Sequence, residues 1–288
     1  RGLGDVYKRQ VPGPHPPTRT GADEYPGSHS MNAGKILVCM IAGLLLTACA
    51  SSPEVKDEKH KANVAAKANT ELGVEYLREG NYEQSRVKLE KALELEPDYA
   101  PAHDAIAVLY EKVGENRLAE KHYKRSLKLN PDSARAHNNY GQFLCFRDRP
   151  EEATKEFLKA ADNPFYATPE VPLSNAGMCA ARIPDLAAAS EYYRLALQKN
   201  PGFAPALLQM AIIRYEEGNY LGARGYLQRL QQAATLNPQS LWLAVRTEYA
   251  LNDHQAWGEY AIILKNNFPD SNETALLLEW ENERRSRY

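Results

Sequence analysis

The feature that most constrains the fold of this chain is an internal repeat of 34 residues. Pro97 and Pro131 lie 34 residues apart, and small residues recur on the same register at Gly73, Ala107 and Gly141. A unit of this length holds two helices and a turn, and it cannot bury its apolar face alone. The chain is therefore predicted to be an all-α solenoid, in which each repeat packs against the next.

The repeat continues to the C-terminal region after an insertion of two residues, and its pattern resembles that of tetratricopeptide (TPR) repeats. Small side chains at the helix crossing let two antiparallel helices approach closely. One large residue per repeat fills the remaining space, namely Leu89, Tyr123, Phe157, Tyr193 and Leu227. The predicted architecture is a superhelix of about six helix-turn-helix repeats at roughly 66–99, 100–133, 134–169, 170–203, 204–237 and 238–270, with a closing helix to residue 286.

Two of these units are irregular in sequence. The segment 163–172 is rich in proline, so it is expected to distort the stack locally. The sixth repeat is the weakest, because Trp257 stands where a small residue is usual. Both departures predict local changes in packing rather than an end to the solenoid.

An export signal precedes the repeats. Residues 1–30 contain five Pro and five Gly without an apolar period, and we interpret them as a non-native or disordered extension that ends before Met31. Residues 31–48 carry Lys35 and then an apolar run from residue 36 to 46. This run is too short for a membrane-spanning helix, which needs about 20 residues, so it predicts a signal peptide.

The end of that signal, Leu46-Thr47-Ala48-Cys49, resembles the lipobox of bacterial lipoproteins. The resemblance implies that Cys49 is lipidated and becomes the first residue of the mature chain. Ala50, where an Asp is absent, implies sorting to the outer membrane. Residues 49–65 are then expected to be a lipidated cysteine and a polar tether, and 66–286 to be the TPR solenoid.

The composition argues against nucleic acid and against catalysis. Lys and Arg total 35 against 37 Asp and Glu, which leaves no basic excess to neutralise a phosphate backbone. No hydrolase, zinc-protease, phosphate-loop or Cys-x-x-Cys motif occurs. His103, His122 and His137 lie on different turns of different predicted helices, which favours packing over metal binding. We expect no enzyme activity, no cofactor and no metal.

The combination of lipobox, short tether and six TPRs resembles the type IV pilus biogenesis lipoproteins known as PilF or PilW. The segments 138–145 and 175–179 also look like that family's third and fourth repeats. The resemblance implies a pilotin, an outer-membrane lipoprotein on the periplasmic face that brings secretin subunits to that membrane and promotes their assembly. The alternative is a general periplasmic TPR adaptor that recruits a peptidoglycan hydrolase or another envelope complex.

TPR geometry implies that the first helices of the repeats line a concave groove. The side chains expected there are largely apolar and suit an amphipathic helix or an extended hydrophobic peptide. They are Val74, Leu77, Val108, Asn138, Gln142, Met178, Leu208, Ile212, Tyr215, Trp242, Arg246 and Tyr249. The alternative is that part of this stripe only packs against neighbouring helices. The carboxylate clamp of chaperone-binding TPRs is disfavoured, because Thr70 and Val74 stand where that clamp needs Lys and Asn.

Cys145 and Cys179 are predicted to form a disulfide. Cys39 leaves with the signal and Cys49 is lipidated, so these two cysteines remain in an oxidising compartment. The repeat register places both on first helices of adjacent repeats at nearly the same level. The alternative is a pair of buried free thiols.

Overall fold

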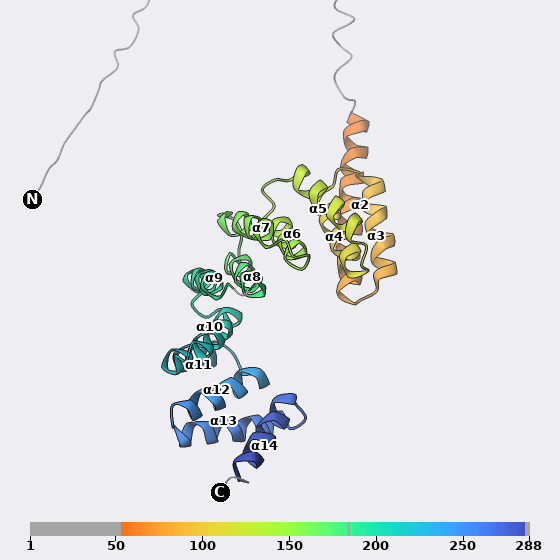
Figure 1. Ribbon diagram of the computed structural model, residues 1–288. Coiled ribbons are helices and arrows are strands. Elements are labelled where there is room, and N and C mark those ends of the chain that lie inside the picture. Colours follow the sequence, from red (N-terminus) through yellow and green to blue (C-terminus); the bar gives the residue numbers. More distant parts are fainter. Residues whose placement is uncertain (1–52, 184, 286–288) are drawn as a thin grey trace, which may run out of the picture. The chain divides into compact units, whose positions relative to one another are not determined.

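The computed structural model describes residues 53–183 and 185–285, which form an all-helical TPR superhelix (Figure 1). The predicted signal peptide and Cys49 lie outside these residues. The thirteen described helices are α2 (Pro53–Arg78), α3 (Tyr82–Leu95), α4 (Ala100–Lys112), α5 (Asn116–Leu129), α6 (Ala134–Cys145), α7 (Pro150–Asp162), α8 (Glu170–Arg182), α9 (Leu186–Lys199), α10 (Ala204–Glu216), α11 (Tyr220–Ala233), α12 (Pro238–Ala250), α13 (His254–Asn267) and α14 (Asn272–Arg285).

The helix starts follow the sequence period. The first helices α4 and α6 begin 34 residues apart, α6 and α8 begin 36 apart, and each later first helix again begins 34 after the one before it. The second helices keep the same steps. The insertion therefore lengthens one connection by two residues, and the 34-residue spacing resumes directly after it.

The α2 helix differs from the expectation for the tether. It begins at Pro53, so residues 53–65 are helical where a polar tether was predicted. Alanine, lysine and glutamate are good helix formers, and an ion pair of 2.6 Å joins Lys61 and Asp57 one turn apart. A helix rises only about 1.5 Å per residue, less than half the reach of an extended chain.

The first, second, third, fifth and sixth repeats turn at the same place by means of a left-handed residue. Gly80, Gly114 and Gly218 have φ of 76°, 83° and 74° there. In the third and sixth repeats the equivalent residues are Asp148 and Asn252, with φ of 54° and 57°. Asn and Asp are the residues other than glycine that tolerate this conformation best.

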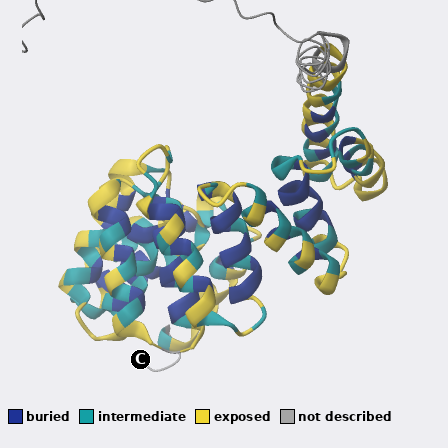
Figure 2. Ribbon diagram, turned by 90° about the horizontal axis from the view of Figure 1, so that it is seen from above, coloured by how far each residue is buried: buried dark blue, intermediate teal, exposed yellow. Residues whose placement is uncertain are grey.

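The core of each repeat is the crossing of its two helices, and Figure 2 shows buried residues on the faces that the helices turn toward one another. At Gly141 a Cβ atom would lie 2.8 Å from the ring of Phe157, and at Gly177 one would lie 2.8 Å from the ring of Tyr193. Both rings are buried, with at most 1% of their surface exposed. The large side chain thus occupies the space that the small one leaves.

The sixth repeat reverses this distribution of volume. Val245 and Trp257 replace the small residues at the crossing, and Ala261 stands where the earlier repeats carry Leu, Tyr or Phe. Val245 and Ala261 are both buried. The repeat that looked weakest in sequence therefore keeps its packing through a compensating exchange of large and small side chains.

None of the described helices is both long enough and apolar enough to cross a lipid bilayer.

The crossing gives a direct test of stability. Gly141→Ala should lower the free energy of unfolding by about 1–3 kcal/mol, because the added methyl meets the Phe157 ring. Gly225→Ala is the matched control: a Cβ there has no atom within 4 Å, so the change should stabilise helix α11 by about 0.5–1 kcal/mol. Urea denaturation followed by circular dichroism measures both, and equal effects would contradict the proposed packing.

Candidate functional site: the groove of the first helices

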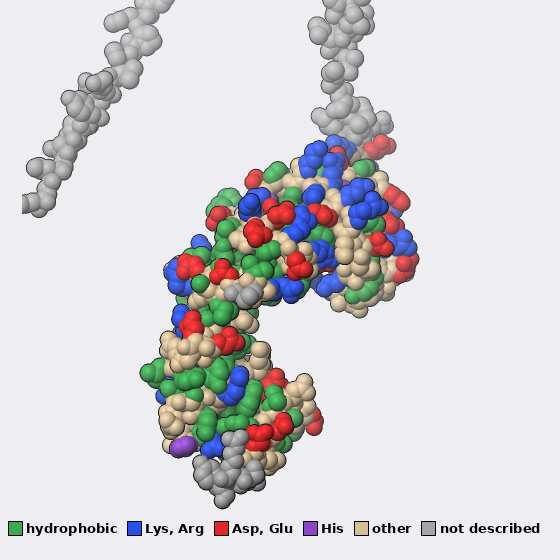
Figure 3. Space-filling view, in the orientation of Figure 1, with side chains coloured by type: hydrophobic (Ala, Val, Ile, Leu, Met, Phe, Trp, Pro, Cys, Tyr) green, Lys and Arg blue, Asp and Glu red, His purple; other side chains and the backbone are tan. Residues whose placement is uncertain are grey.

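The twelve residues expected in the groove all lie on the first helices α2, α4, α6, α8, α10 and α12. Ten of them are partly buried, which is the exposure expected of a concave wall. Asn138 is buried at 6% exposure and Tyr249 is exposed at 37%. Figure 3 shows charged side chains of both signs crowded over the N-terminal repeats and broader apolar patches over the C-terminal ones.

A cavity of about 670 Å³ lies at the N-terminal end of this stripe, between α2, α4 and α6. Its apolar lining includes Val74, Leu77 and Val108. Charged side chains also line it, namely Lys67, Glu71, Glu75, Arg78 and Arg135. An apolar lining with charged groups among it is typical of a surface that binds an amphipathic segment.

Asp104 is a buried acid in the lining of this cavity. Its exposure is only 4%, and its partners are Arg135, whose Nε lies 3.2 Å away, and Asn139, whose amide donates to both carboxylate oxygens at 3.2 Å. Burial raises the pKa of the Asp104 carboxyl, while Arg135 and Asn139 oppose that rise. The ionised side chain therefore lowers the stability of the fold at neutral pH.

A second cavity, of about 410 Å³, lies between α8, α10 and the start of α12. Met178 and Leu208 line it together with Asn175 and Gln209. The Asn175 side chain donates a hydrogen bond of 2.8 Å to the Asn138 side chain on α6. Asn138 is thus engaged in packing between first helices, whereas Met178 and Leu208 face an open space.

Ile212 and Tyr215 continue the apolar wall on α10. Both pack against a buried cluster that includes Leu227 and Leu243. The ring of Tyr215 also contacts the ring of Tyr220, with the centroids 5.3 Å apart.

The C-terminal end of the groove carries two residues that the sequence analysis missed. Trp280 of α14 contacts Trp242 and Tyr249 edge to face, with ring centroids 6.2 and 4.8 Å apart. The guanidinium of Arg284 lies 4.4 Å from the centre of the Tyr249 ring. Because α14 begins 34 residues after α12, the same register that placed Arg246 in the groove would have found Trp280 there.

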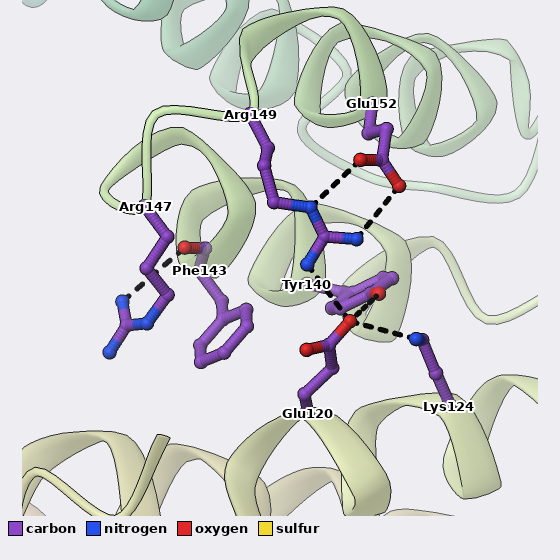
Figure 4. Close-up of polar contacts among 7 residues, drawn as sticks. All are labelled: Glu120, Lys124, Tyr140, Phe143, Arg147, Arg149 and Glu152. Carbon is purple, nitrogen blue, oxygen red and sulfur yellow. Dashed lines mark hydrogen bonds and ion pairs between the residues drawn. The ribbon is translucent and has the colours of Figure 1, made fainter. Parts of the chain in front are cut away.

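Gln142 is partly buried on α6, and the same repeat carries a polar network that includes Tyr140 of α6 (Figure 4). Glu120 accepts hydrogen bonds from Arg149 at 2.9 Å and from the Tyr140 hydroxyl at 3.2 Å, and Lys124 lies 2.8 Å away. These contacts, Lys124 foremost, lower the pKa of Glu120 to about 2. Arg149 also binds both oxygens of Glu152. The network joins α5 to α6 and α7, so we infer that it stabilises the interface between the second and third repeats.

The histidines also have structural partners. The Nε2 atoms of His103 and His137 donate to the carbonyls of Pro97 and Pro131, at 3.0 and 2.7 Å. The neutral His103 ring can then accept at Nδ1 from His122, 2.9 Å away. Burial, together with the repulsion that a protonated His103 would exert, lowers the pKa of His122 to about 4. In the described part of the chain no group of three potential ligands could hold a metal ion.

Cys145 and Cys179 form a disulfide between α6 and α8, with their Cα atoms 5.7 Å apart. Both are buried, at 2% and 1% exposure. The bond joins the two repeats on either side of the proline-rich insertion.

The charge on Asp104 provides a test with a defined sign. Because the pKa of Asp104 is raised in the folded protein, protonation of this carboxyl stabilises the fold. That contribution is complete below the ordinary carboxyl pKa and is lost as the pH rises through the folded pKa. Asp104→Asn should therefore raise the urea midpoint at pH 7, and the difference should shrink as the pH falls toward about 4. A constant difference across this range would show that ionisation is not its cause.

The disulfide provides a second test. Replacing Cys145 and Cys179 together by Ser should lower the free energy of unfolding by about 3–4 kcal/mol, since the bond closes a loop with a sequence separation of 34. Thiol labelling of the denatured, unreduced protein, read by mass spectrometry, should leave both cysteines unmodified. Labelling of either without reductant would refute the bond in solution.

The repeats and most of the chain are similar to known proteins. Tetratricopeptide repeat models match residues 66–99, 100–133 and 122–155. The chain is 34% identical over 229 residues to the type IV pilus assembly protein PilF of Pseudomonas aeruginosa strain PAO1. The matched region covers 78% of this chain and 90% of that protein. An uncharacterized protein of Haemophilus influenzae is 30% identical over 146 residues, covering 51% of this chain and 80% of that protein.

Two solved structures agree with these similarities. The structure of Pseudomonas aeruginosa PilF superposes with a TM-score of 0.67 at 34% identity, over 77% of this chain and 99% of that one. The structure of PilW, described as a widely conserved type IV pilus biogenesis factor, gives 0.65 at 33% identity, over 74% and 98%. The chain therefore belongs to the PilF/PilW family of type IV pilus biogenesis TPR proteins.

Proposed function

We propose that this protein is a pilotin, which captures secretin subunits of the type IV pilus in its groove and promotes their assembly at the outer membrane. The observation that supports this most is its similarity to PilF over 90% of that protein, combined with a cavity on the first helices that is lined by both apolar and charged side chains. Membership of the family indicates a role in the type IV pilus system, and the groove offers a surface on which a protein partner could bind.

The chemistry of the groove favours a polypeptide ligand. Val74, Leu77 and Val108 offer apolar contacts, and the charged pairs Lys67–Glu71 and Arg78–Glu75 stand among them. An amphipathic helix or an extended hydrophobic segment presents both kinds of group on one face. We therefore infer that the protein acts by binding and not by catalysis.

The anchor is proposed to be lipid on Cys49, which would hold the protein on the periplasmic face of the outer membrane. The proposed organisation is an extension at 1–30, a signal peptide at 31–48, a lipidated segment at 49–65 and the solenoid at 66–286. Helix α2 begins four residues after Cys49 in the sequence. Little extended chain would then separate the lipid from the first helix.

Cys49→Ser tests the anchor. The variant should lose lipidation and leave the outer-membrane fraction, because a single modified cysteine carries the proposed attachment. Secretin multimers in the outer membrane should fall with it, as seen by fractionation and immunoblotting. Normal outer-membrane recovery of the variant would contradict the lipoprotein assignment, and normal secretin assembly in a deletion strain would contradict the pilotin role alone.

Val74→Asp and Leu208→Asp test the two cavities. Truncating or charging a central anchor commonly costs about 2 kcal/mol or more in binding, so either change should weaken secretin capture about thirtyfold if its cavity binds. Leu221→Asp is the control, because Leu221 is 69% exposed on the second helix α11. Capture is measured with purified full-length protein whose circular dichroism is unchanged.

The comparison of these variants also separates the alternatives. Loss with only one of the two cavity variants would locate the binding segment. Full secretin capture by both would contradict the groove as its binding surface. Recovery of a peptidoglycan hydrolase in place of secretin would favour the general adaptor.

A further inference from the structure

The C-terminal end of the groove holds an alternating series of aromatic rings and arginines. The Arg246 guanidinium lies 4.9 Å from the centre of the Tyr215 ring and 5.4 Å from that of Trp242. Trp242 meets Trp280 edge to face. Arg284 then lies 4.9 Å from the centre of the Trp280 ring. We call these five residues, together with Tyr249, the aromatic–arginine ladder.

The two arginines of the ladder have no counter-ion among the residues that the structure describes. Among the described residues neither makes an ion pair or a hydrogen bond, and the buried nitrogens without any partner include Nε of Arg246 and Nη1 of Arg284. Cation–π contacts stabilise a guanidinium but satisfy none of its N–H donors. Both side chains are only partly buried, so their remaining nitrogen atoms stay accessible to a ligand.

The neighbouring carboxylates are engaged elsewhere. Glu248, on the same helix as Arg246, is buried and binds Arg224 of α11, with Nε 3.0 Å from its Oε1. Asp253 also accepts from Arg224, at 3.1 Å. Glu217 at the end of α10 pairs with Arg214 at 2.6 Å. Elsewhere in the solenoid many arginines have such partners, which makes the two in the ladder unusual.

We propose that the ladder binds a carboxylate-bearing segment of the partner polypeptide, with acidic side chains on Arg246 and Arg284 and apolar side chains against the tryptophans. Guanidinium groups bind carboxylates through paired N–H donors, and stacking on rings fixes the fork in place. The inference rests on the proposed function only in taking a polypeptide as the occupant. It adds the chemical character of the segment that the C-terminal repeats select.

The ladder is not the carboxylate clamp of chaperone-binding TPRs, which would lie in the first repeat and use other residues. The ladder is built from α10, α12 and α14. Its edge-to-face contacts also attach α14 to α12, so the same residues close the solenoid and present the positive charge. If the ladder only stabilised the fold, the protein would bind acidic and neutral peptides equally well.

The tryptophans of the protein allow binding at the ladder to be followed by fluorescence. Its three tryptophans are Trp242, Trp257 and Trp280, and Trp280 contacts both of the others. Intrinsic tryptophan fluorescence of the full chain in detergent therefore reports on the ladder and its immediate surroundings. Two N-acetylated, C-terminally amidated peptides serve as probes: one carries Glu, Phe and Leu in a Gly-Ser background, and the other has Gln at each Glu.

The Glu peptide should bind about tenfold more tightly than the Gln peptide, and added salt should reduce that difference. Arg246→Gln and Arg284→Gln should each remove most of the preference, and Arg246→Lys should restore only part of it because a lysine lacks the fork. Arg229→Gln is the charge-matched control, since Arg229 lies over the Tyr226 ring on α11, outside the groove. It should leave the preference unchanged.

Equal binding of the two peptides to the unaltered protein, or no binding of either, would overturn the proposal without relying on any variant. Secretin capture distinguishes it from the proposed function. If secretin is captured through the N-terminal cavity while Arg246→Gln has no effect on capture or on the peptide preference, the ladder proposal fails and the pilotin role stands. If the peptide preference holds while secretin is not captured, the pilotin role fails and the ladder stands.

Discussion

The structure depends on one contact, the close crossing of the two helices within each repeat. Where Gly141 faces Phe157 or Gly177 faces Tyr193, the helices are close enough that a single added methyl group would meet a buried ring. Because each repeat of a solenoid contacts mainly its neighbours, the same crossing repeated along the chain builds the continuous wall of first helices on which the groove lies.

The insertion in the middle of the chain tests how local that dependence is. The first helices on either side of it begin 36 residues apart, yet the 34-residue spacing resumes at once. Asn163 at the start of the connection donates to the Asp132 carbonyl at 2.7 Å, and the Cys145–Cys179 bond joins the flanking first helices. The extra residues are absorbed in the connection, so the wall continues across the insertion.

The sequence was sufficient for the helix pairs, because the period, the prolines and the small residues all act within one repeat. It was insufficient at the two ends. The start of α2 is helical because its residues have high intrinsic helix propensity, whereas their polar composition alone predicts an extended tether. The ladder depends on side chains from three helices, and the groove positions had not been continued onto α14. Asn138 was placed on the correct helix, but its bond to Asn175 removes it from the open surface.

Both ends of the groove carry charged groups whose burial is unfavourable. At one end burial disfavours the ionised form of Asp104, although Arg135 pairs with it, and at the other end Arg246 and Arg284 have no counter-ion among the described residues. In a single-core domain such groups would weaken the whole fold, whereas a solenoid confines the loss to the repeats that carry them. Neighbouring repeats hold their charges in pairs, as Glu120 and Arg149 do. If the ladder binds as proposed, an acidic segment would supply the counter-charge that Arg246 and Arg284 lack among the described residues.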